Sequence, residues 1–182
     1  MFIASQKRKE NIAEYLLYMW QVEDLIRANN LDIDKITINI VDKFNLTVEQ
    51  RKLLIEWYES LIDMMRQEDV VVKGHLQINK NIIIQLAQLH DLLLKDSRFT
   101  EYNAAYYKTL PFIVELRAKA GEYMQGELET CFTALYGLLM LRLKGNELTN
   151  DTQMALTQIS RFIALLSHYF NLDSQNDLFK ED

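Results

Sequence analysis

The chain has 182 residues, of which 49% are hydrophobic and 25% are charged, and a single domain of this size can bury a full core. Its formal net charge of −6 at pH 7 would be repelled by a phosphate backbone, so nucleic acid is disfavoured as a partner. Five glycines and one proline are few for the turns that an all-β fold needs. These numbers favour long helices joined by short connections.

The cysteine content and the N-terminus bear on the compartment. Cys131 is the single cysteine, so an internal disulfide is impossible, and this suits a reducing compartment. The first residues, MFIASQKRKEN, contain no apolar core of a signal peptide and no cleavage pattern. We therefore expect a cytoplasmic protein without a membrane partner, in which Cys131 is a small core residue rather than a nucleophile.

The first predicted helix covers residues 5–29. Its apolar stripe consists of Ile12, Tyr15, Leu16, Met19, Val22 and Ile26, with Trp20 on the shoulder. Glu23 falls within this apolar face, and Arg27 follows four residues later, at the spacing of an ion pair on a helix.

The middle of the chain alternates helices and connectors. Residues 34–44 show a short helical pattern that also alternates as a strand would. Thr47 and Gln50 have the spacing of a capping box, which predicts a helix to about residue 68. Residues 70–77 resemble a turn or an extended connector. Asn79 or Asn81 could then cap a helix that ends near residue 95. His90 lies on the inner face of this predicted helix.

A further helix is expected over residues 99–120. Pro111 should kink or split it, because proline removes an amide donor, and Gly121 is a natural stop. The last predicted helix starts near Thr149 and reaches about residue 171, and the polar residues 172–182 are expected to fray.

The segment from Glu127 to Lys144, ELETCFTALYGLLMLRLK, is apolar almost all round, which is typical of a helix covered on most sides. We predict that it forms the centre of the fold, with Leu135 and Leu138 almost inaccessible. Arg142 lies in line with its main apolar stripe. Another side carries small residues that would let a neighbouring backbone approach closely, namely Gly126, Thr130, Thr133 and Gly137.

The prediction is an all-α protein: a compact helical bundle of six or seven helices around this central apolar helix, with a single domain over residues 1–171. Two stretches, NIAEYLLYMWQVEDLIRANN and LYGLLMLRLKGNELTNDT, resemble an uncharacterised all-helical family, a domain of unknown function from Bacteroidetes bacteria. The resemblance extends from the first helix to about Asn171. It implies a small cytosolic helical protein and assigns no activity, ligand or cofactor to particular residues.

No recognisable catalytic motif occurs. None of His75, His90 and His168 follows a glutamate at the Glu-x-x-His spacing of di-metal bundles. Phosphate-binding glycine loops and the Gly-x-Ser-x-Gly elbow are missing as well. We therefore expect no metal and no cofactor.

Four polar residues lie on otherwise apolar helix faces: Glu23, Arg27, His90 and Arg142. One interpretation is a buried ion-pair network, because an unpaired buried charge is costly. The other is a cleft that binds a polar ligand, with His90 able to titrate. Under the first interpretation we expect Glu23 to form a salt bridge with Arg27 or Arg142.

The favoured function is a non-catalytic cytosolic interaction or scaffold module. It would self-associate, or bind a protein partner, through an apolar surface on Trp20, Leu17 and Leu25. The alternative is a small-molecule-binding or enzymatic helical bundle that uses the four polar residues as its site.

Overall fold

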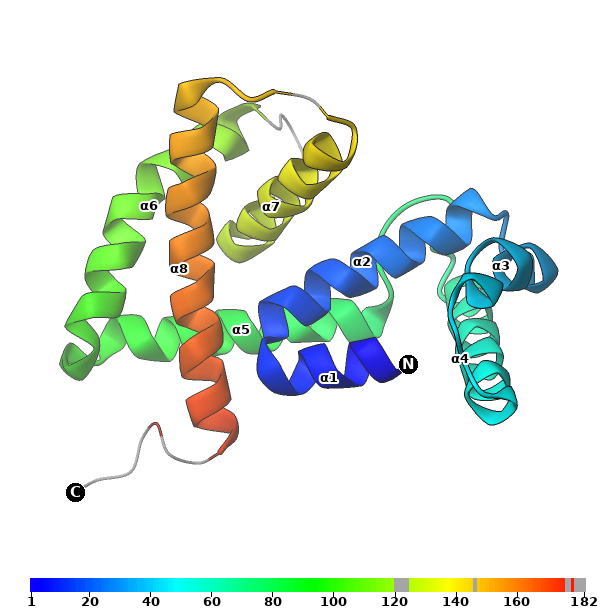
Figure 1. Cartoon of the computed structure of the whole chain (residues 1–182). Coiled ribbons are helices and arrows are strands. Elements are labelled where there is room, and N and C mark those ends of the chain that lie inside the picture. The colour runs from blue at the N-terminus through cyan, green and yellow to red at the C-terminus, as the bar shows by residue number, and fades with distance from the viewer. Residues whose placement is uncertain (120–124, 146, 176–177, 179–182) are drawn as a thin grey trace.

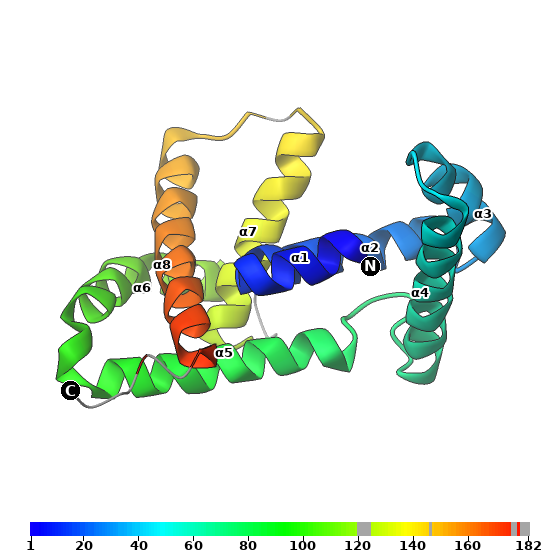
Figure 2. The same ribbon diagram turned by 60° about the horizontal axis from the view of Figure 1, so that its bottom comes forward.

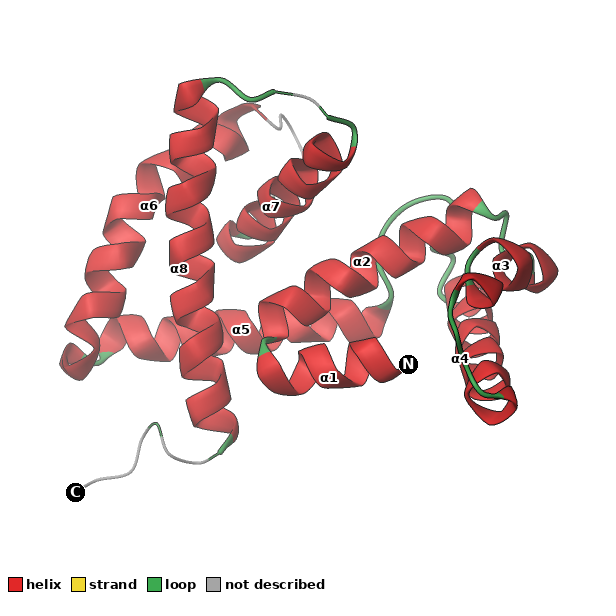
Figure 3. Cartoon of the chain, viewed as in Figure 1, coloured by secondary structure: helices red, strands yellow, loops and turns green. Residues whose placement is uncertain are grey.

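The structure, a computed structural model, describes residues 1–119, 125–145, 147–175 and 178. Within these ranges the chain forms helices and no strand, which confirms the all-α prediction (Figure 3). The α-helices are α1 (Phe2–Glu10), α2 (Ile12–Ala28), α3 (Ile33–Asn39), α4 (Val48–Gln67), α5 (Gln77–Lys95), α6 (Thr100–Lys119), α7 (Glu127–Leu143) and α8 (Asn150–Ser174), and the 3-10 helices are η1 (Val41–Lys43) and η2 (Ser97–Phe99).

The first predicted helix is in fact two helices, which meet at Asn11. This residue has extended backbone angles, φ −154° and ψ 108°, and its side chain accepts hydrogen bonds from the backbone N–H groups of Ala13 and Glu14. Asparagine is a strong N-cap because its short side chain satisfies amides that the helix leaves unpaired. Asn11 therefore ends α1 and starts α2, and the prediction of one continuous helix was wrong.

The start of α5 also differs from the prediction. The capping box of Thr47 and Gln50 is present at α4. The cap of α5 is instead Leu76, which has no side-chain oxygen, so Asn79 and Asn81 are not caps. Asn79 is fully buried inside the first turn of α5. Another part of the chain supplies the acceptor for this helix start, as described below.

Helix α6 runs through Pro111 without being split. Figures 1 and 2 both show it curving along its length, as expected where a proline removes one helical hydrogen bond. Because it stays continuous, α6 keeps Tyr102 and Ile113 in the core, each with no exposed surface.

Helix α2 is the element around which the others are arranged. It contacts α1, α4, α5, α7 and α8. In Figures 1 and 2, α3 and α4 lie at its C-terminal end, whereas α6, α7 and α8 gather toward its N-terminal half. Its residues are buried on several sides, and the fully buried ones include Leu16, Met19, Trp20, Val22, Glu23 and Ile26. No described helix is long and apolar enough to cross a membrane.

Helix α7 is covered in its N-terminal half only. Cys131 and Phe132 have no exposed surface, whereas Leu135 and Leu138 are half-buried and Leu143 is 66% exposed. Figure 2 shows the C-terminal half of α7 standing clear of α1 and α2, with α8 beside it. The prediction that Leu135 and Leu138 are almost inaccessible was wrong, because the second half of α7 extends past the helices that could cover it.

Helix α8 continues past the predicted end at Asn171 to Ser174. The Asn171 side chain donates a hydrogen bond of 2.8 Å to the carbonyl oxygen of Glu10 and so ties α8 to the end of α1. Leu178 packs against the core. The remaining tail residues 176–177 and 179–182, and the predicted stop at Gly121, lie outside the described residues.

Candidate functional site

The carboxylate of Glu23 is fully buried and accepts three hydrogen bonds from the start of α5. Its Oε1 accepts from the backbone N–H of Leu76 at 2.9 Å and from Nδ2 of Asn79 at 2.7 Å, and its Oε2 lies 2.6 Å from Nδ1 of His75. Amides at a helix start are unpaired within the helix and favour a negative charge. Glu23 of α2 therefore serves as the cap that Leu76 cannot provide.

His75 is oriented by this carboxylate and by an aromatic ring. An ionised carboxylate only accepts hydrogen bonds, so Nδ1 of His75 carries a hydrogen and donates it to Glu23. The other ring nitrogen, Nε2, takes no part in this contact. The imidazole stacks on the indole of Trp20, with ring centroids 4.0 Å apart and an interplanar angle of 11°. The side chain is 29% exposed, so the ring lies between the buried Glu23 and the solvent.

Arg27 holds the other part of the same loop. Its Nη2 donates to the carbonyl oxygen of Val70 at 3.0 Å and to that of Gly74, while its Nη1 forms an ion pair of 2.9 Å with Asp24. Gly74 has a φ of +90°, a left-handed conformation that glycine adopts without strain. Glu23 and Arg27, one helical turn apart on α2, thus hold residues 70–76 between them.

The predicted salt bridge of Glu23 with an arginine was wrong. Within the described part of the chain its partners are His75, Leu76 and Asn79. Burial of Glu23 and its need for partners follow from its position on the apolar face of the helix. The donors come from the loop that follows α4 and from the first turn of α5, and nothing in the pattern of residues 70–77 indicates that this segment returns to α2.

The contacts around Glu23, His75 and Asn79 form a cluster that extends to α7 through Trp20. The indole makes edge contacts with Phe132 and Tyr136, whose ring centroids lie 6.3 and 5.7 Å away. The hydroxyl of Tyr136 donates to Asp24 at 2.6 Å, and burial together with this carboxylate raises the pKa of the phenol. Two buried polar atoms of the cluster have no hydrogen-bond partner in the described structure, Nε1 of Trp20 and Oδ1 of Asn79.

His90 lies elsewhere, in an aromatic cluster between α5, α6 and α8. Its Nδ1 is 2.7 Å from the hydroxyl of Tyr102, and the rings of Tyr106 and Phe162 are within 4.8 and 5.8 Å of the imidazole centroid. Burial lowers the pKa of His90 below its ordinary value of 6.5, against the smaller opposing effect of Glu127 and Asp91. His90 is therefore a neutral core histidine that pairs with a tyrosine.

This lowered pKa predicts a pH dependence of stability. The unfolded chain takes up a proton on His90 more readily than the fold does, so the histidine favours the fold above the unfolded pKa of 6.5 and destabilises it as the pH falls below that value. We expect the free energy of unfolding to fall between about pH 7.5 and 5.5, and to fall less in His90→Gln. Chemical denaturation across this range measures both slopes. Equal slopes in the two proteins would contradict a buried neutral His90, because the rest of the chain is the same in both.

Arg142 is exposed near the end of α7. It borders a groove of about 180 Å³ against α8, together with Leu138, Leu156 and Arg161. The four residues predicted as one site therefore fall in three places: Glu23 and Arg27 at the loop 70–76, His90 in the aromatic cluster, and Arg142 at the end of α7. No group of three or more histidine, cysteine or acidic side chains among the described residues could hold a metal ion.

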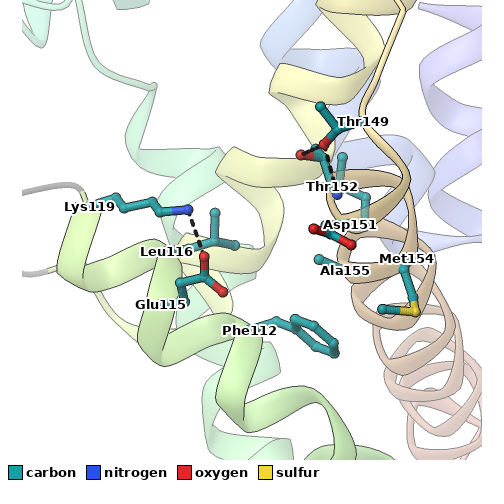
Figure 4. A pocket seen from close by; sticks show the side chains of 10 residues that line it. Phe112, Glu115, Leu116, Lys119, Thr149, Asp151, Thr152, Met154 and Ala155 are labelled. Carbon is teal, nitrogen blue, oxygen red and sulfur yellow. Dashed lines mark hydrogen bonds and ion pairs between the residues drawn. The ribbon is translucent and has the colours of Figure 1, made fainter.

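A larger groove, of about 520 Å³, lies between the C-terminal part of α6 and the first turns of α8 (Figure 4). Phe112, Leu116 and Ala155 contribute apolar surface to it, and the 2.7 Å ion pair of Lys119 with Glu115 lies at its edge. Sequence reasoning did not find this groove, because it arises only where two antiparallel helices meet. The helix ends of α6 and α8 that border this groove lie at the same end of the molecule as the C-terminal half of α7 (Figure 1).

Fold and site together define an all-α protein in which charged side chains of one helix hold a loop and an apolar helix is partly uncovered. A model of one family, the domain of unknown function DUF4924, matches residues 1–177. The chain therefore belongs to this uncharacterised domain family. No curated protein and no solved structure matched the chain.

Proposed function

We propose that the protein is a non-catalytic helical interaction module that self-associates through the C-terminal half of α7. The observation that carries this proposal is that a helix apolar on nearly all sides is left partly open. Leu141 is 37% exposed and Leu143 is 66% exposed, and Leu138, Leu139 and Met140 of the preceding turn are only half-buried. Contiguous exposed apolar surface commonly marks a protein interface.

This surface replaces the one expected from the sequence. Trp20 is 2% exposed beneath His75, Phe132 and Tyr136, so it cannot contact a partner. Leu17 is half-buried against the core, and only Leu25 of that group is open, at 41%. The sequence led us to expect this surface on α2, and the apolar surface that we propose for association is instead on α7.

A second candidate function, binding of a small polar molecule, has one observation in its favour. Nε1 of Trp20 and Oδ1 of Asn79 are buried without a partner beside the Glu23–His75 pair. A crystal structure of the purified protein tests this candidate. Density for a bound molecule against His75 would support it, and density for protein and water alone would contradict it.

We also infer that the protein is cytoplasmic and comes from a bacterium of the Bacteroidetes. The single cysteine supports the first inference, because Cys131 has no exposed surface and burial raises the pKa of its thiol to about 12, which suits a reduced structural residue. Fractionation of the source cells tests the location. Recovery of the protein outside the cytoplasm would contradict it.

Introducing a charge on α7 should separate association from folding. We expect the wild type to show a concentration-dependent mass, and Leu141→Glu to remain monomeric because a carboxylate would be desolvated in the interface. Sedimentation equilibrium measures the mass. Leu92→Glu is the matched control, because Leu92 is 53% exposed and belongs to α5 rather than to the α7 surface, so its substitution should leave the mass unchanged. A wild type that is monomeric at every concentration would contradict the proposed function.

A further inference from the structure

We infer that α7 pairs with α7 of a second copy in an antiparallel arrangement, with a two-fold axis beside Gly137. This inference rests on the proposed self-association and specifies its geometry. Closed two-fold dimers are the commonest symmetric assemblies, and each uses the same surface on both copies. The surface must therefore be complementary to itself, and α7 meets this requirement in shape and in charge.

The shape comes from a row of exposed residues on one side of α7. Thr133, Gly137, Leu141 and Lys144 recur at intervals of three and four residues, so they share a face at about 100° per residue. All four are exposed, whereas Cys131 on the opposite side is fully buried. The face is low at its centre, because Gly137 has no side chain, and the space beside it is open, since a Cβ atom added there would meet nothing within 4 Å. A second helix can therefore approach the backbone closely at this glycine.

The charges select the antiparallel direction and a second copy as the occupant. Glu129 and Lys144 flank Gly137 on its two sides (137 − 129 = 8 and 144 − 137 = 7 residues). In an antiparallel pair each Glu129 faces Lys144 of the other copy, about 11 Å from the axis on either side. A parallel pair would instead place like charges together. Antiparallel helix dipoles add to the preference.

These two charges are available for such contacts. Glu127, the neighbouring acid, already accepts from the hydroxyl of Tyr106 at 2.8 Å and lies 4.0 Å from Arg117. Within the described residues the side chains of Glu129 and Lys144 have no ion pair or hydrogen bond. If the two helices cross at about 20°, the angle typical of helix bundles, the long side chains of Glu129 and Lys144 can reach each other in both pairs.

The first test places a bulky side chain at the crossing point. Gly137→Leu should abolish the dimer, because the added side chain separates the helices where they are closest. The same change should leave the monomer at least as heat-stable, since leucine favours a helix over glycine and meets open space in the fold. Gly126→Leu is the matched control. The space beside Gly126 is also open, but the residue opposite it in the antiparallel pair would lie beyond the end of α7. The Gly126→Leu variant should therefore still form the dimer.

The second test reverses the charges. Glu129→Lys and Lys144→Glu should each weaken association about tenfold, and the double variant should restore it. The two residues are 15 positions apart on one helix (144 − 129 = 15), or about 22 Å, so a rescue must occur between copies. Sedimentation equilibrium of all four proteins at micromolar concentrations measures these changes.

The outcomes separate the pairing from the proposed function. A monomeric wild type overturns both. A dimeric wild type whose mass is unchanged by Gly137→Leu overturns the pairing and leaves self-association intact. The same holds if the double charge reversal weakens association further than the single ones. Loss of the dimer in Gly137→Leu together with charge rescue supports the antiparallel pair.

Discussion

Replacing Glu23 with alanine should lower the free energy of unfolding by about 3–5 kcal/mol, the range seen when a buried hydrogen-bonded charge loses its partner. The carboxylate accepts from His75, Leu76 and Asn79, and it is fully buried. Its removal leaves the backbone amide of Leu76, the N-cap residue of α5, and the side-chain amide of Asn79 without an acceptor, and each buried unsatisfied group is costly. Urea denaturation followed by circular dichroism measures the loss.

Two further variants identify the cause. Glu23→Gln keeps the shape and one acceptor oxygen, so we expect a smaller loss of about 1–2 kcal/mol. Asp24→Ala removes a neighbouring acid that is 50% exposed and pairs with Arg27, and its cost should stay below about 1 kcal/mol. Equal losses in Glu23→Ala and Asp24→Ala would show that Glu23 does not hold the start of α5.

The second large effect is expected within α7. Phe132→Ala should lower the free energy of unfolding by about 3–5 kcal/mol, because Phe132 is fully buried against Trp20 and its removal leaves a cavity. Leu141→Ala, nine positions further along the same helix (141 − 132 = 9), should cost under about 1 kcal/mol in the monomer because its side chain is 37% exposed.

The comparison tests whether α7 is buried in its first half only. Both proteins should be measured at a concentration where the chain is monomeric, since association would stabilise the exposed half. A large loss in Leu141→Ala under that condition would mean that another part of the same chain covers the end of α7. Melting temperatures at two concentrations provide the check.

Several features of the fold follow from local sequence. The capping box of Thr47 and Gln50 positions the start of α4, because both partners lie within one turn. Periodic apolar residues predict α2, α4, α5, α6 and α8, since a stripe at helical spacing must be buried. Cys131 was correctly predicted as a core residue from its apolar neighbours. The break at Asn11 was missed, although asparagine is a common cap, because residues 5–10 contain no glycine or proline that would interrupt the predicted helix.

The burial of Glu23 and of His90 was also visible in the sequence, because both lie on apolar helix faces. Their partners were not. Glu23 bonds to residues more than fifty positions away, and His90 pairs with Tyr102 of the next helix. Helical periodicity gives the direction of a side chain relative to its own axis and carries no information on which distant segment it meets.

Sequence by itself determined the all-α class, most helix positions and which faces of those helices are buried, because these depend on local propensity and on periodicity. Only the tertiary structure decided that α2, rather than α7, is the central element, and that Arg142 and His90 lie apart from Glu23. The physical reason is that apolarity shows what a helix could bury, whereas actual coverage depends on how far its neighbours extend. For α7 they end before Leu141 and Leu143, and this leaves the surface on which the proposed function rests.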